Sequence, residues 1–140
     1  MTGYTVRPVA DDLDTGGFFA AAQDGQVGVQ HCGECGQVLH MPRAYCRHCG
    51  AFSPQWRAVA PTGTIFSYTV VTHQVHPAFE VPYTVLLVEL DEPAGVRLIG
   101  HVPGRPAVHI GQPVRASFPA LPDGSLLPNW ELLDGDAVAS

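Results

Sequence analysis

The stretch HCGECGQVLHMPRAYCRHCG, residues 31–50, holds all four cysteines of the 140-residue sequence. They form two Cys-x-x-Cys pairs with ten residues between the pairs, and a glycine follows each pair. Two such turns bring four thiolates together, which is the ligand set of a tetrahedral structural zinc. A glycine after each pair can adopt a positive φ and turn backbone N–H groups toward the sulfur atoms. The stretch therefore predicts a zinc ribbon with Cys32, Cys35, Cys46 and Cys49 as metal ligands.

The same spacing leaves alternatives for the metal site. A rubredoxin-type iron site uses the same four ligands, so the sequence does not exclude iron. A dithiol redox site is disfavoured, because one redox motif does not need a matching second pair. His31 and His48 adjoin ligands, but a zinc closed by four thiolates leaves no position for a histidine, a substrate or a water molecule. We therefore expect a structural metal that does not catalyse, and two surface histidines.

The composition predicts a soluble globular protein. Hydrophobic residues make up 46% of the sequence and charged residues 14%, which is rich enough for a core and too balanced for disorder. No apolar run approaches the roughly 18 residues needed to cross a bilayer, and residues 1–17 lack the basic start and apolar core of a signal peptide. We therefore expect a cytoplasmic protein without a membrane partner, in a compartment where cysteines stay reduced.

The charge balance argues against a nucleic-acid partner. Thirteen acidic residues outnumber seven basic residues, all of them arginine, and the formal net charge is -6. Nonspecific affinity for nucleic acids comes mainly from lysine and arginine at phosphates. A nucleic-acid-binding protein built from a ribbon and a barrel is therefore the weaker alternative.

Five short runs of β-branched and aromatic residues follow Trp56. They are residues 63–72, 83–90, 96–102, 113–118 and 126–132. Turn signals rich in glycine and proline separate these runs, and no long helical pattern intervenes. Short strands joined in this way predict a five-stranded OB-fold barrel, ahead of an SH3-like barrel or a sandwich. The expected fold class is mainly β, with a short N-terminal helix and a rubredoxin-like zinc ribbon followed by the barrel.

The chain divides into four predicted parts. They are an N-terminal lead-in with a short helix at 1–25, the zinc ribbon at 26–56, the OB-fold barrel at 57–134 and a disordered tail at 135–140. Asp14 or Thr15 is expected to cap the helix. The ribbon has too few large apolar side chains to fold without its metal. Phe52 and Trp56 are expected at the junction of ribbon and barrel.

The loop THQVHPAFEVPY, residues 72–83, is the main candidate for chemistry outside the metal site. It carries His73, His76 and Glu80. A histidine and a carboxylate can form an acid–base pair, but proximity in a Pro-containing loop does not bring them within hydrogen-bonding reach. The sequence contains no Gly-x-Ser-x-Gly elbow, phosphate-binding Gly-rich loop or dinucleotide fingerprint. We therefore expect no catalytic residue in this chain.

The chain resembles a known family from about Gly17 to Leu132. The matching segments are GFFAAAQDGQVGVQHCGECGQVLHMPRAYCRHCG, a tryptophan, GTIFSYTVV, HPAFEVPY, VELDE, GVRLIGHV, IGQPV and LPNWEL. In order and spacing they are similar to the OB-fold family with an N-terminal rubredoxin-like zinc ribbon, catalogued as domain of unknown function thirty-five. Two features depart from the family. Phe18-Phe19 stands where members often have Phe-Trp, and the connection HVPGRPAVHIGQPV is shorter than usual.

The resemblance implies an accessory role. Members are generally accessory subunits, or fused domains, of enzymes that handle acyl-CoA thioesters, and a thiolase-like partner carries the catalytic residues. The four cysteines match the family's metal ligands one for one. The resemblance thus implies a non-catalytic zinc subunit of a hetero-oligomer, most specifically a steroid side-chain retro-aldolase complex. An acyl-CoA acetyltransferase or thiolase complex is the first alternative.

Five residues are candidates for contact with the partner or with the acyl-CoA. They are Phe18, Phe19, His73, His76 and Phe79. A further alternative is a self-sufficient acyl-CoA enzyme that uses the histidines of the 72–83 loop or Glu80.

Overall fold

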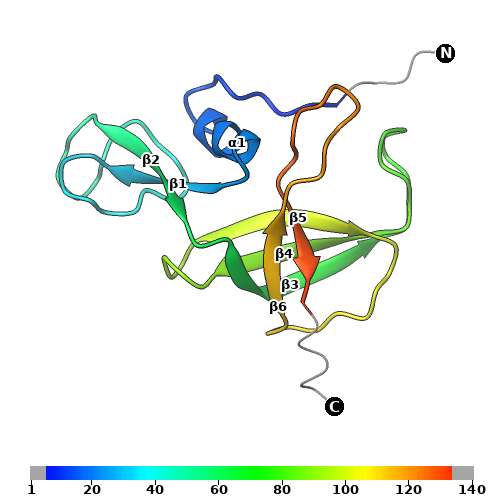
Figure 1. The fold of residues 1–140 in the computed structure, drawn as a ribbon. Coiled ribbons are helices and arrows are strands. Elements are labelled where there is room, and N and C mark those ends of the chain that lie inside the picture. The colour runs from blue at the N-terminus through cyan, green and yellow to red at the C-terminus, as the bar shows by residue number, and fades with distance from the viewer. Residues whose placement is uncertain (1–5, 134–140) are drawn as a thin grey trace.

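The computed structural model describes residues 6–133, which form one α-helix and seven β-strands (Figure 1). In chain order they are α1 (Gly16–Gln23), β1 (Val27–Cys32), β2 (Pro54–Val59), β3 (Thr62–Val71), β4 (Tyr83–Leu90), β5 (Arg97–Pro103), β6 (Pro113–Ser117) and β7 (Asn129–Leu132). β1 pairs with β2, and a five-stranded sheet has the order β5-β4-β3-β6-β7. Within residues 6–133, no helix has the length and hydropathy that a membrane span requires.

The five-stranded sheet forms the predicted OB-fold barrel. Its neighbouring strands are antiparallel, and β4 alternates between buried and half-buried residues along its whole length. The register between β3 and β4 shifts between Ile65 and Ser67, which leaves Phe66 as an extra residue that bends the strand. β5 and β7, the two ends of the sheet order, contact each other. The predicted fold class is therefore confirmed.

One side chain joins β5 to β7 where the barrel closes. Asn129 Oδ1 accepts a hydrogen bond from the backbone N–H of His101. Gly100 allows this close approach, because a Cβ atom there would lie 2.5 Å from Trp130 Cδ1 and 2.7 Å from Asn129 Oδ1. Trp130 is thereby buried in the barrel core. We call this contact between β5 and β7 the seam.

The ribbon joins the barrel through β1. Val27 and Val29 are buried in the same hydrophobic cluster as the barrel core. Trp56 of β2 lies instead against Gly17 of α1, where a Cβ atom would be only 2.3 Å from the indole. Phe52 is 78% exposed. Its predicted place at the ribbon–barrel junction was wrong, because the short valines of β1 fill that interface.

Helix α1 starts at a cap formed by a preceding loop residue. The Asp12 carboxylate accepts hydrogen bonds from the backbone N–H groups of Asp14, Thr15 and Gly16, at 3.0, 2.6 and 2.7 Å. Hydrogen bonds from the Thr15 backbone and hydroxyl hold the pKa of Asp12 below its ordinary value. Thr15 occupies the N-cap position, but its own side chain makes no capping bond. Asp12 therefore supplies the capping oxygen that the sequence analysis assigned to Asp14 or Thr15.

Candidate functional site

The four cysteine sulfur atoms converge in the ribbon. All four lie within 4.8 Å of one another, and the Cys32–Cys49 and Cys35–Cys46 sulfur pairs are each 3.6 Å apart. Sulfur atoms placed tetrahedrally about 2.3 Å from a zinc ion would be separated by about 3.8 Å. The four cysteines form no disulfide. The sulfur cluster therefore fits a tetrahedral metal ion.

Two glycine turns shape this cluster. Gly36 and Gly50 have φ values of 77° and 80°. Their N–H groups donate to the carbonyls of Cys32 and Cys46, at 2.9 and 2.7 Å, which closes each Cys-x-x-Cys turn. The positive φ expected from the sequence is confirmed, and side chains other than glycine adopt it rarely.

The pKa values of Cys32 and Cys49 are shifted in opposite directions. The backbone N–H groups of Cys35 and Glu34 lower the pKa of Cys32 to about 6. For Cys49 the backbone N–H of Ala51 favours the thiolate, yet burial and the three neighbouring thiols raise its pKa to about 12. Thiolates this close repel one another, so all four ionise together only when a cation lies between them. The cluster therefore requires a metal for its fully ionised state.

Gln30 supports the cluster from β1. It is buried, its Oε1 accepts the Arg43 N–H at 2.7 Å, and its carbonyl accepts the Leu39 N–H at 2.8 Å. Leu39 packs with Cys32 and Cys46 in a small hydrophobic cluster of its own. Gln30 was not among the predicted site residues, although a lone polar residue in the β-prone run VGVQ was a usable signal. With so small a core, the ribbon depends on its metal for stability.

The two histidines beside the ligands do not join the sulfur cluster. The group of metal-ligand atoms found within residues 6–133 contains the four cysteines alone. His48 is exposed, as expected. His31 is half-buried rather than exposed, because its Nδ1 lies 2.9 Å from the Val29 carbonyl oxygen.

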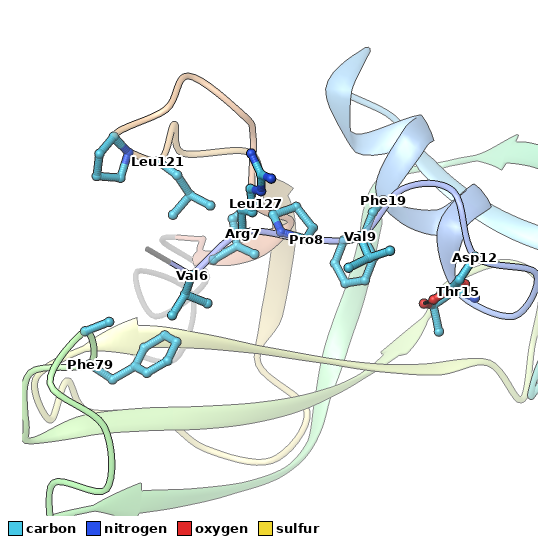
Figure 2. A pocket seen from close by; sticks show the side chains of 12 residues that line it. Val6, Arg7, Pro8, Val9, Asp12, Thr15, Phe19, Phe79, Leu121 and Leu127 are labelled. Carbon is cyan, nitrogen blue, oxygen red and sulfur yellow. Dashed lines mark hydrogen bonds between the residues drawn. The ribbon is translucent and has the colours of Figure 1, made fainter. Parts of the chain in front are cut away.

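An apolar groove of about 780 Å³ lies between the N-terminal segment, α1 and two loops of the barrel (Figure 2). Phe19 lines it from α1, Phe79 from the loop between β3 and β4, and Leu121 and Leu127 from the loop before β7. Figure 2 shows Phe19 and Phe79 at different ends of the groove. Arg7 Nη1 lies 3.9 Å from Asp123 Oδ2, which forms an ion pair between the N-terminal segment before α1 and the loop before β7. We call this cavity the apolar groove.

The structure brings together some of the predicted contact residues. Phe18 packs edge-on against Phe19, with ring centroids 5.1 Å apart, and His76 lies 5.9 Å from Phe79. Phe19 and Phe79 are the members of the set that line the apolar groove. His73 lies in an exposed position before the loop turn and does not line the groove.

The loop between β3 and β4 is held by its own hydrogen bonds. His76 Nδ1 accepts the Ala78 N–H at 3.0 Å, and Gln74 Nε2 donates to the Phe79 carbonyl at 3.1 Å. The Phe79 N–H donates to the His76 carbonyl at 3.0 Å. These bonds set the position of Phe79 at the edge of the groove.

A second group of rings, which the sequence analysis missed, continues from Phe79. Tyr83 and His101 lie 6.3 and 6.1 Å from Phe79 between ring centroids, and 5.5 Å from each other. Asn129 contacts His101 from β7. Burial lowers the pKa of His101. The alternation of the strand sequence places His101 on the outward face, but no sequence signal links it to an asparagine 28 positions away.

Two family descriptions match consecutive parts of the chain. "ChsH2, rubredoxin-like zinc ribbon domain" matches residues 19–55, and "ChsH2, C-terminal OB-fold domain" matches residues 56–119.

Two curated proteins are similar in sequence. A "probable enoyl-CoA hydratase alpha subunit" of Thermomonospora curvata is 41% identical over 110 residues, which cover 77% of this chain and 34% of that protein. A "3-oxo-4,17-pregnadiene-20-carboxyl-CoA hydratase alpha subunit" of Mycobacterium tuberculosis is 46% identical over 71 residues, which cover 49% of this chain and 22% of that protein. The chain thus spans about a third of the first relative's length and less of the second's.

Two solved structures are similar in fold. A chain of the structure titled "Ltp2-ChsH2(DUF35) aldolase" is 37% identical with a TM-score of 0.79, and the match covers 90% of this chain and 98% of that chain. A DUF35-family protein of unknown function from Sulfolobus solfataricus is 18% identical with a TM-score of 0.50, covers 71% and 73% of the two chains, and shows the fold alone. The sulfur geometry, the barrel and these likenesses agree on one assignment. This chain belongs to the ChsH2, or DUF35, family, and it carries the structural zinc site of a rubredoxin-like ribbon joined to an OB-fold domain.

Proposed function

We propose that this chain is a non-catalytic subunit that completes a thiolase-like enzyme acting on acyl-CoA thioesters. The likeness to 98% of a chain in the Ltp2-ChsH2(DUF35) aldolase carries the proposal, because that aldolase is named for two components and this chain is similar to the ChsH2 one. The specific reaction we propose is retro-aldol cleavage of a steroid side-chain thioester. The steroid acyl-CoA in the name of the M. tuberculosis relative supports this choice.

The metal geometry supports a structural role for the zinc in this function. Cys32, Cys35, Cys46 and Cys49 are the ligands in this proposal, with sulfur separations that fit four-coordination. A zinc ion closed by four thiolates has no open position for substrate or for an activated water. The ribbon then stabilises the base of β1, which packs into the barrel core.

The apolar groove is the surface we propose for contact with the partner or with the acyl group. Its lining is dominated by aromatic and aliphatic side chains, with Phe19 and Phe79 the largest. Concave apolar surfaces of this kind commonly bind ligands or anchor residues of a partner. Phe18 contacts Phe19 and His76 contacts Phe79, and we propose that His73 also contacts the partner.

Copurification followed by an activity assay tests this function. The zinc-loaded chain is tagged in its native host, the coeluting protein is identified, and cleavage of a steroid side-chain thioester is measured with each protein alone and with both. We expect cleavage only from the mixture, and a ketone with a shortened acyl-CoA as products. Full activity of the partner alone, or turnover by this chain alone, would overturn the proposal. Acyl transfer by the mixture would instead favour an acetyltransferase or thiolase complex.

A further inference from the structure

The Asn129 side chain determines which nitrogen of His101 carries the proton. The Asn129 oxygen, Oδ1, accepts the backbone N–H of His101, so this end of the amide is fixed as the acceptor. The other end, Nδ2, lies 3.3 Å from His101 Nδ1 and can only donate. Nδ1 must therefore accept. The proton of the neutral imidazole consequently lies on Nε2.

The same contact keeps the imidazole neutral. A protonated ring would carry a hydrogen on Nδ1, and this hydrogen would oppose the N–H group of Asn129. Burial lowers the pKa of His101, which acts in the same direction. Near neutral pH, His101 is thus an uncharged hydrogen-bond donor through Nε2.

His101 lines a hollow of about 420 Å³ beside the apolar groove. Phe79 and Tyr83 also line it, and their ring planes lie at 86° and 67° to the imidazole. The N–H of Gly104 donates to the Pro82 carbonyl at 2.9 Å, which joins the two chain segments on either side of the hollow. We call this cavity the His101 hollow.

The charges around the His101 hollow select an uncharged ligand. Among the nine described residues that line it, Glu80 carries the one formal charge, and none is arginine or lysine. A carboxylate or phosphate would therefore meet a negative side chain and a neutral ring. A neutral carbonyl oxygen accepts the Nε2–H without this repulsion, and an apolar body attached to it can contact Phe79 and Tyr83.

We propose that the His101 hollow binds an uncharged carbonyl group, with Nε2–H of His101 as the donor. Asn129 is the positioning residue, because it holds the ring in the tautomer that donates from Nε2. Phe79 borders both this hollow and the apolar groove, so one ligand can extend through both. Identifying the ligand as the acyl-pantetheine arm of a CoA thioester rests on the proposed function.

The tautomer is tested first, on the full-length zinc-loaded protein. Nitrogen NMR of the imidazole should show an unprotonated Nδ1 and a protonated Nε2. Asn129→Asp replaces the donor with a carboxylate, so we expect the proton to move to Nδ1 and the pKa of His101 to rise. A proton on Nδ1 in the unsubstituted protein would overturn the proposal.

Binding is tested with S-acetylpantetheine, an uncharged thioester. We expect it to shift the His101 Nε2–H resonance, and His101→Phe, which keeps a ring but removes the donor, to bind about tenfold more weakly. His109→Phe changes an exposed histidine outside the hollow and should bind like the unsubstituted protein. If His101→Phe does not fold, the Asn129→Asp variant replaces it. At a pH above the raised pKa of His101, this variant has an unprotonated Nε2 that cannot donate, so it should also bind weakly. Equal affinity in all variants, or no binding, would overturn the proposal.

This experiment fails independently of the proposed function. S-acetylpantetheine is titrated into this chain without a partner. Absence of binding combined with an active mixed complex would rule out the carbonyl-binding site but leave the accessory role intact. Binding combined with a partner that is fully active by itself would instead rule out the accessory role and support the carbonyl-binding site.

Discussion

Gln23 and Leu126, 103 positions apart, exchange two hydrogen bonds. Gln23 Nε2 donates to the Leu126 carbonyl at 2.9 Å, and the Leu126 N–H donates to Gln23 Oε1 at 2.8 Å. The side-chain amide thereby pairs with both backbone groups of Leu126, as a neighbouring strand would. It fixes the distance between α1, which carries Phe19, and the loop that carries Leu121 and Leu127.

Gln23→Met removes both of these bonds and retains most of the side-chain volume. We expect a loss of about 1 kcal/mol of unfolding free energy, because the freed backbone groups are exposed and can bind water. The Leu126 amide should also exchange its hydrogen faster, measured by NMR. Gln26→Met is the matched control, since Gln26 is an exposed glutamine just after α1. Equal exchange rates of the Leu126 amide in the two variants would contradict a role for the Gln23–Leu126 hydrogen bonds.

Removal of one metal ligand should unfold the ribbon. Cys49→Ser is expected to lose the zinc, measured as metal per chain by mass spectrometry, and about 4 kcal/mol or more of unfolding free energy. His48→Ala, a change at the exposed neighbour of the same ligand, should keep one zinc per chain. Iron with a visible thiolate charge-transfer band in the purified protein would contradict zinc.

Gly100→Ala should destabilise the barrel by about 1–3 kcal/mol, because the new Cβ atom would overlap Trp130 and Asn129. Chemical denaturation measures the loss. Trp130→Ala removes Cδ1 and Nε1, the Trp130 atoms nearest to that Cβ, so a double-mutant cycle should show costs that are less than additive. Additive costs would mean that the seam does not depend on this contact.

Stability should fall at acidic pH through His101. Burial lowers its pKa in the folded protein, so as the pH falls through about 6.5 the unfolded chain binds a proton that the folded chain does not. The contribution is absent above that pH and grows until the pH reaches the folded pKa. His101→Phe should lessen the fall in unfolding free energy between about pH 8 and pH 5. His73→Phe is the control, and a slope reduced equally in both variants would contradict the assignment.

Phe79→Ala should lower kcat/KM of the mixed complex about tenfold or more, because large apolar anchors dominate such surfaces. Val75→Ala is the matched control, since Val75 lies in the same loop, is 84% exposed and does not line the groove. Comparable losses in the two variants would argue against the groove as the contact surface.

Much of the fold follows from the sequence because its signals are local. The Cys-x-x-Cys-Gly turns define the metal site within a few residues, and runs of β-branched and aromatic residues between turn signals define the five strands. The capping oxygen of Asp12 was missed because it comes from outside the helix it caps. Phe52 was misplaced because an aromatic residue in a small ribbon does not reveal which neighbour covers it, and here it remains exposed.

The candidate site was harder to predict, because its contacts are distant in sequence. The His101–Asn129 pair depends on the closing of the barrel, and the orientation of an amide cannot be read from residue types. Phe19 and Phe79 were predicted as contact residues, and both are half-buried in the structure. Their common groove required the loop before β7, which carried no functional signal.

The seam also bears on the order of assembly. β3, β4 and β5 pair as consecutive neighbours, and the ribbon precedes them in the chain. Within residues 6–133, β7 pairs in register with β6 alone, and its contact with β5 depends on Asn129 and Trp130. Strand pairings between segments close in sequence close smaller loops and form sooner. Pairing of β3, β4 and β5 and folding of the zinc-bound ribbon can therefore precede the docking of β7. In this order β7 is the last strand to dock. The His101 hollow therefore acquires its oriented histidine only when folding is complete.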